Sequence, residues 1–197
     1  MPLALDAAAQ DLLFHQAHTA RAFTDEPVTD EQVRAIYDLI KLAPTAHNSS
    51  PLRVTLLRSA EAKARLLPLL SEGNRAQTAA APLTAILSLD LRFHEKLPKL
   101  FPVVPDLKDL AYADPEGRER AGLLSTGLQI GYFVLGVRAA GLAAGPMSGF
   151  DAGAVDKEFF GDGRQRALVV VNIGRPGDTA YNPRLPRLDF DEAVSVL

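Results

Sequence analysis

The pattern of apolar positions along the chain predicts several amphipathic helices and a few short strands. After Thr29, a T-x-x-Q capping box marks the start of one helix. Four apolar residues then fall on one face at helical spacing: Val33, Ile36, Tyr37 and Ile40. We therefore expect a helix that buries this face and ends by Pro44.

Three apolar runs predict strands, at residues 53–58, 83–89 and 167–174. The last run, ALVVVNIG, is continuous, rich in β-branched residues and bounded by glycine. Such a run is typical of a strand that is buried on both faces. The segment GPMSGFD, residues 145–151, is expected to form a tight apolar loop.

Further helices are predicted over residues 5–16, 60–70, 116–140 and 152–160. Pro68 should shorten or kink the second of these, and Gly141 is a good left-handed terminator for the third. Residues 91–115 carry four prolines and several aromatic residues, so we expect a long loop or lid there. Long helices around a few strands predict an α+β sandwich and not a repeating βαβ chain.

The composition is that of an ordinary globular protein. The 197 residues fit a single domain, 1–197, and 47% hydrophobic with 23% charged residues is a typical balance. With 21 basic and 24 acidic residues, the net charge of −3 leaves no basic excess for a nucleic acid. The chain has no cysteine, which excludes disulfides, thiolate metal sites and a cysteine nucleophile.

Two segments bear on where the protein resides. The start, MPLALDAAAQ, has no basic region and meets Asp6 early, so we expect no secretory signal and a cytoplasmic protein. Residues 121–137 carry no charge, but this run is short for a membrane span and contains Ser125 and Gln129. A helix at the centre of the fold or of an oligomer is the expected structure.

Several common cofactor and catalytic motifs are missing. No G-x-G-x-x-G follows a strand, and there is no Walker A motif, no H-E-x-x-H and no G-x-S-x-G elbow. A dedicated Rossmann site for a dinucleotide is therefore not expected. His15 and His18 lack a visible third metal ligand, so a solvated pair is expected in place of a metal site.

Two polar segments have the chemistry to hold an anionic or heterocyclic ligand. HTARAF combines an imidazole at His18, a hydroxyl at Thr19 and a guanidinium at Arg21, which suit a phosphate or a carbonyl-rich ring. PTAHNSSP, residues 44–51, offers hydroxyl and amide groups on a backbone stiffened by proline. Taken singly, each segment fits a solvated surface turn or a connecting loop better than it fits a ligand site.

Three more segments are weak signals when each stands alone. EGNRAQ places Asn74 and Gln77 one helical turn apart. GPMSGF has small residues that let backbone N–H groups approach a flat ligand. PRLPR, residues 183–187, carries two arginines that could close on a phosphate.

Taken in order, these segments resemble the nitroreductase family of FMN-dependent oxidoreductases. The shared pattern runs from His18 to Arg187 and includes P-[ST]-x-x-N-x-x-P, G-x-x-x-x-P-x-x-G-F and a buried strand that ends in I-G. A narrower likeness, to the malonic semialdehyde reductase branch of pyrimidine utilisation, rests on SEGN, KLPKLFP, GPMSGFD and PRLPRLDF. The resemblance implies an α-β-α sandwich with a short central sheet and a long central helix, assembled as an obligate homodimer.

The resemblance also implies a cofactor, an electron donor and a set of binding residues. FMN would pass hydride from NADH or NADPH to a small-molecule substrate, with no catalytic side chain required. The residues implied to bind FMN are His18, Thr19, Arg21, Pro44, Thr45, Asn48, Ser50, Asn74, Met147, Ser148, Gly149, Arg184 and Arg187. The group from Pro44 to Ser50 would come from the partner subunit. Arg184 or Arg187 would reach the phosphate, and Arg21 would lie near the pyrimidine edge of the flavin.

Two departures from the family pattern reduce the positive charge expected around the flavin. Ala17 stands where many members have arginine, and Gln77 stands where many have lysine. His18 and Arg21 would have to supply the missing charge. One of the aromatic residues of the segment 91–115 would cover the substrate: Phe93, Phe101 or Tyr112.

Three functions of different kinds remain open at this point. The first is an FMN-dependent NAD(P)H oxidoreductase acting on nitro-aromatics, quinones or a small aldehyde such as 3-oxopropanoate. The second is a flavin-binding protein without turnover. The third is an interaction protein that uses its apolar central helix only to dimerise.

Overall fold

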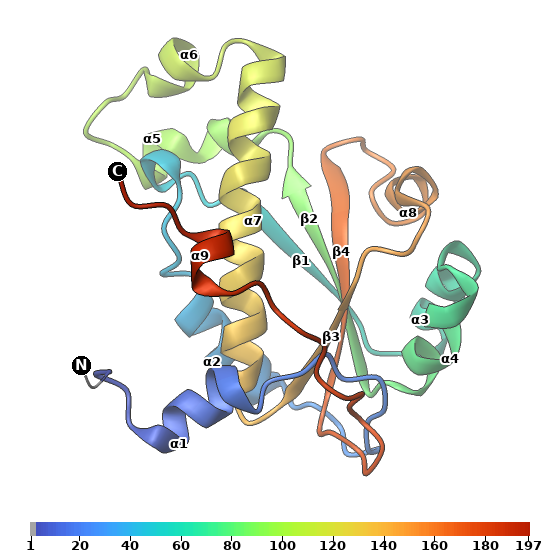
Figure 1. The fold of residues 1–197 in the computed structure, drawn as a ribbon. Coiled ribbons are helices and arrows are strands. Elements are labelled where there is room, and N and C mark those ends of the chain that lie inside the picture. Colours follow the sequence, from blue (N-terminus) through green and yellow to red (C-terminus); the bar gives the residue numbers. More distant parts are fainter. Residues whose placement is uncertain (1–2) are drawn as a thin grey trace.

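A computed structural model describes residues 3–197 and shows a four-stranded antiparallel sheet between two layers of helices (Figure 1). The strands are β1 (Leu52–Leu57), β2 (Leu83–Asp90), β3 (Ala143–Met147) and β4 (Gln165–Gly174). They follow the order β1-β2-β4-β3, so β2 and β4 are the central strands. Every residue of β2 is buried, as are the last five of β4. The expected α+β sandwich is confirmed.

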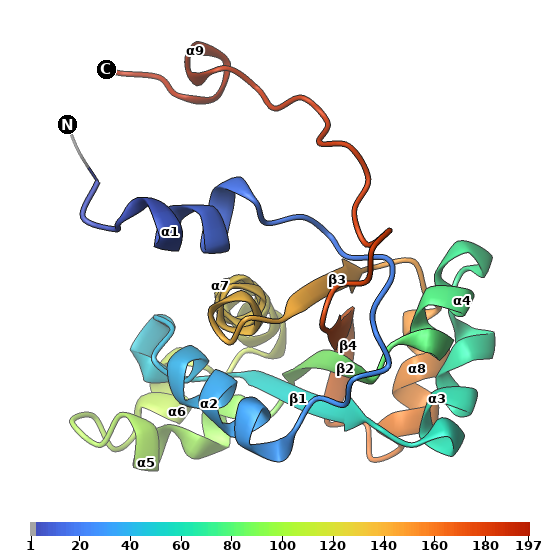
Figure 2. The same ribbon diagram turned by 90° about the horizontal axis from the view of Figure 1, so that it is seen from below.

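The helices divide between the two faces of this sheet, as Figure 2 shows. The helices are α1 (Ala7–Gln10), α2 (Asp30–Ile40), α3 (Ala60–Leu66), α4 (Glu72–Ala80), α5 (Leu97–Leu100), α6 (Leu107–Ala111), α7 (Pro115–Ala139), α8 (Ala152–Phe159) and α9 (Phe190–Ala193). One face is covered by α2 and α7, and the other by α3, α4 and α8. Single turns at residues 11–15, 46–48, 67–69 and 93–96 complete the helical structure.

The largest core lies between the sheet and the α2–α7 pair. Ile36 and Ile40 of α2 and Phe133 and Val137 of α7 pack against inward-facing residues of β2 and β4. A Cβ atom on Gly136 would lie 2.6 Å from Cγ2 of Ile40, so the two helices approach as closely as this glycine permits. The expected burial of Tyr37 with this face is wrong. Its exposed fraction is 59%, because it lies at the solvent edge of α2.

On the other face, apolar packing is combined with a buried chain of polar groups. Leu66, Leu70 and Val155 pack against Ile86 and Val170 of the sheet. Behind them, the Thr84 hydroxyl donates to Asn172 Oδ1 (2.9 Å), and Asn172 Nδ2 donates to the Thr78 hydroxyl (3.0 Å). All three side chains are fully buried, so these bonds satisfy groups that would otherwise be costly to desolvate. The chain of bonds fixes α4 to the sheet.

Local start and stop signals fixed the ends of the helices. The Thr29 capping box is present at α2, with Gln32 donating from its backbone to the Thr29 hydroxyl and accepting in return. Pro68 ends α3 in a single 3-10 turn. Asp114 caps α7 by accepting from the Gly117 backbone (2.7 Å), and Gly141 ends that helix with a φ of +73°.

The segment 145–151 is the main correction to the predicted fold. Its first three residues belong to β3, which pairs with β4 from Ala143↔Gly174 to Met147↔Val170. Gly145 and Pro146 have poor strand propensity, so the sequence pattern does not predict this strand. The structure tolerates Pro146 because β3 is an edge strand, where a missing N–H costs nothing.

Residues 91–115 form a compact cap of short helices above one end of the sheet. Phe93 and Tyr112 are 1% and 3% exposed and pack edge to face with centroids 5.2 Å apart. Leu89, Leu97 and Leu107 complete this cluster. Phe93 and Tyr112 are therefore core residues that hold the cap in place, and neither is free to cover a substrate.

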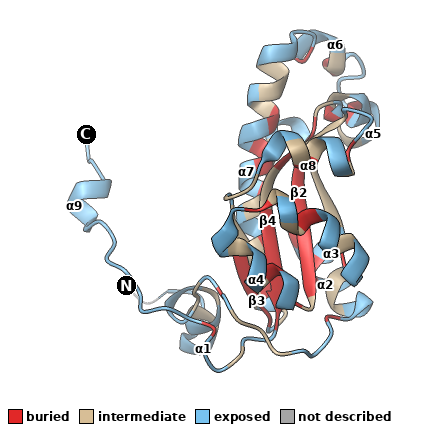
Figure 3. Ribbon diagram, turned by 90° about the vertical axis from the view of Figure 1, so that its right-hand side faces the viewer, coloured by how far each residue is buried: buried red, intermediate tan, exposed pale blue. Residues whose placement is uncertain are grey.

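Two apolar surfaces of the chain remain exposed. Along α7, Leu124 and Leu128 are 71% and 46% exposed. After Tyr181 the chain leaves the body of the fold as an extended tail ending in α9, as Figures 2 and 3 show. Its apolar side chains are exposed, including Leu185, Leu188 and Phe190. Within residues 3–197, no helix combines the length and apolar character needed to cross a bilayer.

Candidate flavin-binding site

The HTARAF segment runs beside β3, next to the small residues of GPMSGF. The Ala20 backbone N–H donates to the Ala144 carbonyl (3.0 Å), and Arg21 N–H donates to the Ala180 carbonyl (2.8 Å). A Cβ atom on Gly145 would collide with the Ala20 carbonyl oxygen, so the two backbones can approach this closely only at a glycine. His18, Thr19 and Arg21 are thereby fixed along one edge of the sheet.

Asn74 lies at the other end of β3, against the turn that follows it. Asn74 Nδ2 donates to the Gly149 carbonyl (3.0 Å), which also accepts from the Ser71 N–H (2.9 Å). Gln77 Nε2 donates to Asn74 Oδ1 (3.0 Å) and so orients the amide. The amide keeps one hydrogen and one lone pair for a ligand. A Cβ atom on Gly149 would lie 2.7 Å from Asn74 Nδ2, so this contact needs glycine.

Several donors in this region are left without a protein acceptor. Among the described residues, neither the Arg21 guanidinium nor the backbone N–H groups of Ser148 and Gly149 donate a hydrogen bond to another protein group. Arg21 and Ser148 are exposed, so both can meet a ligand. Met147 is half-buried and its sulfur accepts a weak bond from the Thr78 hydroxyl (3.8 Å). Donors around a glycine-lined strand suit a flat ligand with several carbonyl oxygens.

The C-terminal tail brings one of its two arginines to this site. Arg184 Nη2 donates to the carbonyls of His15 (2.7 Å) and Ala17 (3.0 Å), which places its guanidinium beside His18. The ring of His18 lies 5.3 Å from that of Tyr181. Within the described part of the chain, Arg187 contacts only the carbonyls of Leu185 and Pro186 in the exposed tail and does not join this group.

The turn from Pro44 to Ser50 is held elsewhere, among α5, α6 and the first half of α7. Asn48 Nδ2 donates to the Leu100 carbonyl (2.9 Å), and the Ala46 N–H donates to the Ser125 hydroxyl (3.3 Å). His47, Asn48 and Ser50 have φ of 53°, 52° and 42°, a left-handed conformation that costs energy outside glycine. The fold therefore holds this turn under strain.

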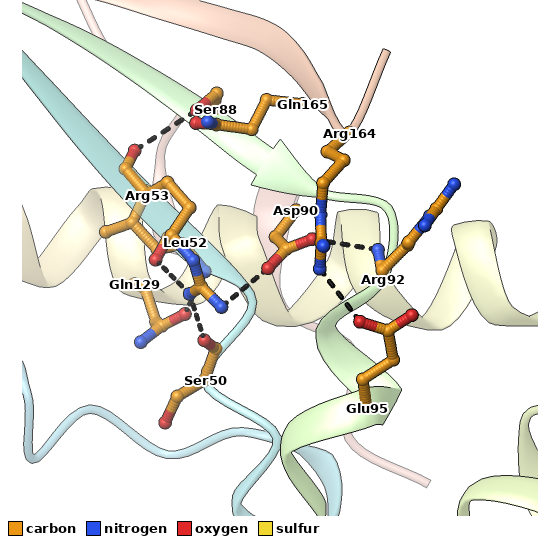
Figure 4. Close-up of polar contacts among 10 residues, drawn as sticks. All are labelled: Ser50, Leu52, Arg53, Ser88, Asp90, Arg92, Glu95, Gln129, Arg164 and Gln165. Atoms are coloured by element: carbon orange, nitrogen blue, oxygen red, sulfur yellow. Dashed lines mark hydrogen bonds and ion pairs between the residues drawn. The ribbon is translucent and has the colours of Figure 1, made fainter. Parts of the chain in front are cut away.

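Figure 4 shows the ion pair that anchors the end of this turn. Arg53 Nη1 donates to the carbonyls of Ser50 (2.9 Å) and Leu52 (2.8 Å), and its Nη2 donates to Asp90 Oδ2 (2.7 Å). Asp90 is nearly buried at the end of β2, and Gln129 of α7 accepts from the Leu52 N–H (2.9 Å). Sequence reasoning missed Arg53 and Asp90. The sequence offered one indication of this pair: each of the two apolar strands carries a charged residue at one of its ends.

Replacing Asp90 with asparagine should destabilise the protein by about 1–2 kcal/mol. The change removes the negative charge that pairs with Arg53 and converts one of the two carboxylate oxygens into an NH₂ group. The oxygen that remains can still accept from the Arg92 N–H (2.8 Å). Urea unfolding monitored by circular dichroism measures this difference. Asp38→Asn breaks a pair with Lys41 whose side chains are 64% and 46% exposed, and should leave the stability nearly unchanged. Equal effects of the two variants would contradict this account of Asp90.

The comparisons with known proteins agree on one family. The family model described as "Nitroreductase family" matches residues 15–175. A protein of Streptomyces griseus, provisionally named NADH dehydrogenase/NAD(P)H nitroreductase, is 59% identical over 197 residues and covers 100% of both chains.

Two solved structures share the fold. A provisionally named nitroreductase of Bacillus subtilis, ydfN, has a TM-score of 0.86 at 19% identity, covering 98% of this chain and 100% of its own. Another provisionally named nitroreductase, solved in complex with FMN from Exiguobacterium sibiricum, has a TM-score of 0.83 at 20% identity and covers 100% and 99% of the two chains. The sandwich, the segments beside β3 and these matches lead to one assignment: the chain belongs to the nitroreductase family.

Proposed function

We propose that the protein is an FMN-dependent NAD(P)H oxidoreductase. The observation that carries this proposal is the group of unpaired donors around β3. Arg21, Ser148 and Gly149 present hydrogens to a ligand from two segments that the fold brings together. The set contains donors for the carbonyl oxygens of a flavin and no acid–base pair. The relatives' names, with their NAD(P)H donor and FMN, support the same chemistry.

The residues of this chain would bind and orient the cofactor. When bound, FMN supplies a two-electron carrier between NAD(P)H and an acceptor. The Arg21 guanidinium would stabilise negative charge on the ring, and the Ser148 and Gly149 amides would fix its position. Asn74, oriented by Gln77, would hold the polar edge of the ring. This interaction gives the uncharged Gln77 a function at the position where many family members have lysine.

We infer further that two copies of the chain build each site. The turn from Pro44 to Ser50 is rigid and polar, yet it lies apart from the residues beside β3 in the same chain. A second copy can bring its turn to this site if the two α7 helices pack together. The exposed leucines of α7 and the apolar tail would be buried in such a homodimer.

The acceptor belongs to a class of small molecules that nitro-aromatics, quinones and short aldehydes represent. An alternative within this class is malonic semialdehyde (3-oxopropanoate), which the segments SEGN, GPMSGFD and PRLPRLDF favour. Because NAD(P)H is an intracellular reductant, the proposed reaction fits a cytoplasmic protein. A screen of these acceptors with NADH and with NADPH separates the possibilities, and a flavin-binding protein without turnover would oxidise neither donor.

Turnover should follow ping-pong kinetics. The donor and the acceptor would use the same exposed site in turn, and no histidine is needed as a proton donor. Double-reciprocal plots at several fixed acceptor concentrations should therefore be parallel. Intersecting lines would mean that donor and acceptor bind together, which would contradict a shared site.

Replacing Arg21 with alanine should weaken FMN binding or slow flavin reduction by about ten- to a hundredfold. A charge-assisted hydrogen bond contributes about 1.5–3 kcal/mol, and no other protein group among residues 3–197 uses this guanidinium. Flavin fluorescence titration and stopped-flow reduction measure both quantities. Arg34→Ala, an exposed arginine on α2, is the matched control and should change neither. An Arg21→Ala variant with wild-type values for both would show that the assigned contact is wrong.

A further inference from the structure

The buried chain of hydrogen bonds between the sheet and α4 reaches the end of β3 that borders the candidate flavin site. The hydroxyls of Thr84 and Thr78 lie on either side of the Asn172 amide. From Thr78 the chain continues to Met147, whose Sδ accepts from the hydroxyl at 3.8 Å. Met147 is the last residue of β3 and directly precedes the backbone donor of Ser148. The groups that attach α4 to the sheet therefore also contact a residue of the flavin site.

The hydroxyl of Thr78 makes its hydrogen bonds inside the protein. Thr78 is 0% exposed, so water cannot replace these bonds. Its oxygen accepts from Asn172 Nδ2 (3.0 Å), and its hydrogen is directed at Met147 Sδ. A thioether is a weak acceptor, but a buried hydroxyl that donates to nothing is unfavourable. The contact therefore favours conformations of Met147 that turn the sulfur towards α4.

Met147 has a side chain that packing alone fixes poorly. It is unbranched and has three rotatable bonds, so it can adopt several conformations in the same space. Met147 is half-buried, and it packs on the core that Leu70 and Val170 help to form. A side chain that is mobile beside a ligand site lowers affinity, because the ligand must immobilise it on binding. The Thr78 hydroxyl can immobilise Met147 before a ligand arrives.

The geometry of α4 places Thr78 beside a second contact to the same part of the chain. Asn74 and Thr78 are four residues apart and lie on one face of α4. Asn74 Nδ2 donates to the Gly149 carbonyl (3.0 Å), while Thr78 contacts Met147. One face of α4 thus holds both ends of the segment 147–149, which carries the backbone donors proposed for the flavin.

We propose that Thr78, held in place by Asn172, is a positioning residue of the flavin site. Its hydroxyl fixes the Met147 side chain and thereby the start of the segment 147–149 that receives the ring. This inference rests on the proposed function. Because Thr78 is fully buried, its effect on the flavin passes through Met147.

The orientation of Met147 can be measured directly, because the chain has two methionines. The flavin-free protein, labelled with carbon-13 at the methionine methyl groups, gives a nuclear magnetic resonance signal for Met147, assigned by its loss in Met147→Leu. Thr78→Val keeps the shape of the side chain and removes the hydroxyl, so this signal should move towards that of a freely rotating methionine. Thr78→Ser keeps the hydroxyl and should restore the wild-type position. An unchanged signal in Thr78→Val would overturn the proposal.

The affinity for FMN tests whether this orientation matters to the site. Thr78→Val should weaken FMN binding about three- to tenfold, as expected for the loss of one hydrogen bond, and Thr78→Ser should recover most of it. In a Met147→Leu background, Thr78→Val should have little further effect, because both changes remove the same contact. Equal effects of Thr78→Val in the two backgrounds would show that Thr78 does not act through Met147, and would overturn the proposal.

Thr126→Val is the matched control. Thr126 is also a fully buried threonine, and its hydroxyl donates to the Gly122 carbonyl (2.7 Å) within α7, on the opposite side of the sheet from α4. The change should leave both the Met147 signal and the affinity for FMN as in the wild type. Thermal unfolding gives the stability that each variant loses. If Thr126→Val weakens FMN binding as much as Thr78→Val does, the effect is one of general stability and the proposal is overturned.

The two measurements separate this inference from the proposed function. A wild-type protein that takes up no FMN would contradict the proposed function. The methionine signal of the flavin-free protein does not depend on that result, and it decides by itself whether Thr78 orients Met147.

Discussion

A Gly131→Leu variant is expected to be a folded monomer that has lost FMN. Apart from the nearby backbone of α7 itself, no atom of residues 3–197 lies within 4 Å of a Cβ atom placed at Gly127 or at Gly131, so the single chain tolerates the change. Both glycines lie on the exposed face of α7, next to Leu124 and Leu128. A leucine at position 131 would keep a second α7 from approaching this face.

The loss of association should be large. Each leucine that the dimer fully buries contributes about 1.5–3 kcal/mol, and several would lose contact together. Sedimentation velocity at micromolar concentration, recorded at the protein and the flavin absorbance, measures both effects. Gly153→Leu adds the same side chain at an exposed position of α8, on the other side of the sheet, and should stay dimeric and yellow.

Two results would contradict the proposed homodimer or its shared flavin site. A dimeric Gly131→Leu variant would show that α7 is not at the interface. A monomer that retains FMN and activity would show that one chain builds the whole site.

A Gly145→Ala variant is expected to lose about 3 kcal/mol of stability and most of its affinity for FMN. The new Cβ atom would overlap the Ala20 carbonyl oxygen, a backbone atom that cannot move by rotation of a side chain. Relief of this overlap must separate β3 from HTARAF and break the bond between Ala20 and Ala144. The donors at Arg21 and Ser148 would then no longer face one ligand.

Denaturant unfolding and flavin titration measure these two losses. Gly161→Ala is the matched control, because a Cβ atom there meets only the Lys157 carbonyl at 3.8 Å, an ordinary contact. We expect it to keep both stability and affinity. If Gly145→Ala loses stability and binds FMN normally, the close approach of these segments does not build the site.

The elements with local signals were predictable from the sequence. The capping box at Thr29 and the left-handed Gly141 each act within a few residues, so they mark helix ends without knowledge of the fold. The continuous β-branched run of β4 indicated a central strand for the same reason. The family pattern added the order of the polar segments, but not their positions in space.

The features that sequence reasoning missed all depend on distant partners. β3 is a strand because it pairs with β4, although Gly145 and Pro146 disfavour one. Arg53 and Asp90 are 37 positions apart and meet only because β1 and β2 are neighbours. Helical periodicity also placed Tyr37 at the edge of an apolar face without showing how wide the buried part is.

The proposed function is tested most simply by the visible spectrum of the purified protein, before and after anaerobic addition of NADH or NADPH. We expect a yellow protein with about one FMN per chain, whose flavin absorbance is bleached by at least one of the two donors and returns when an acceptor is added. A colourless protein that does not take up FMN, or a bound flavin that neither donor reduces, would contradict it.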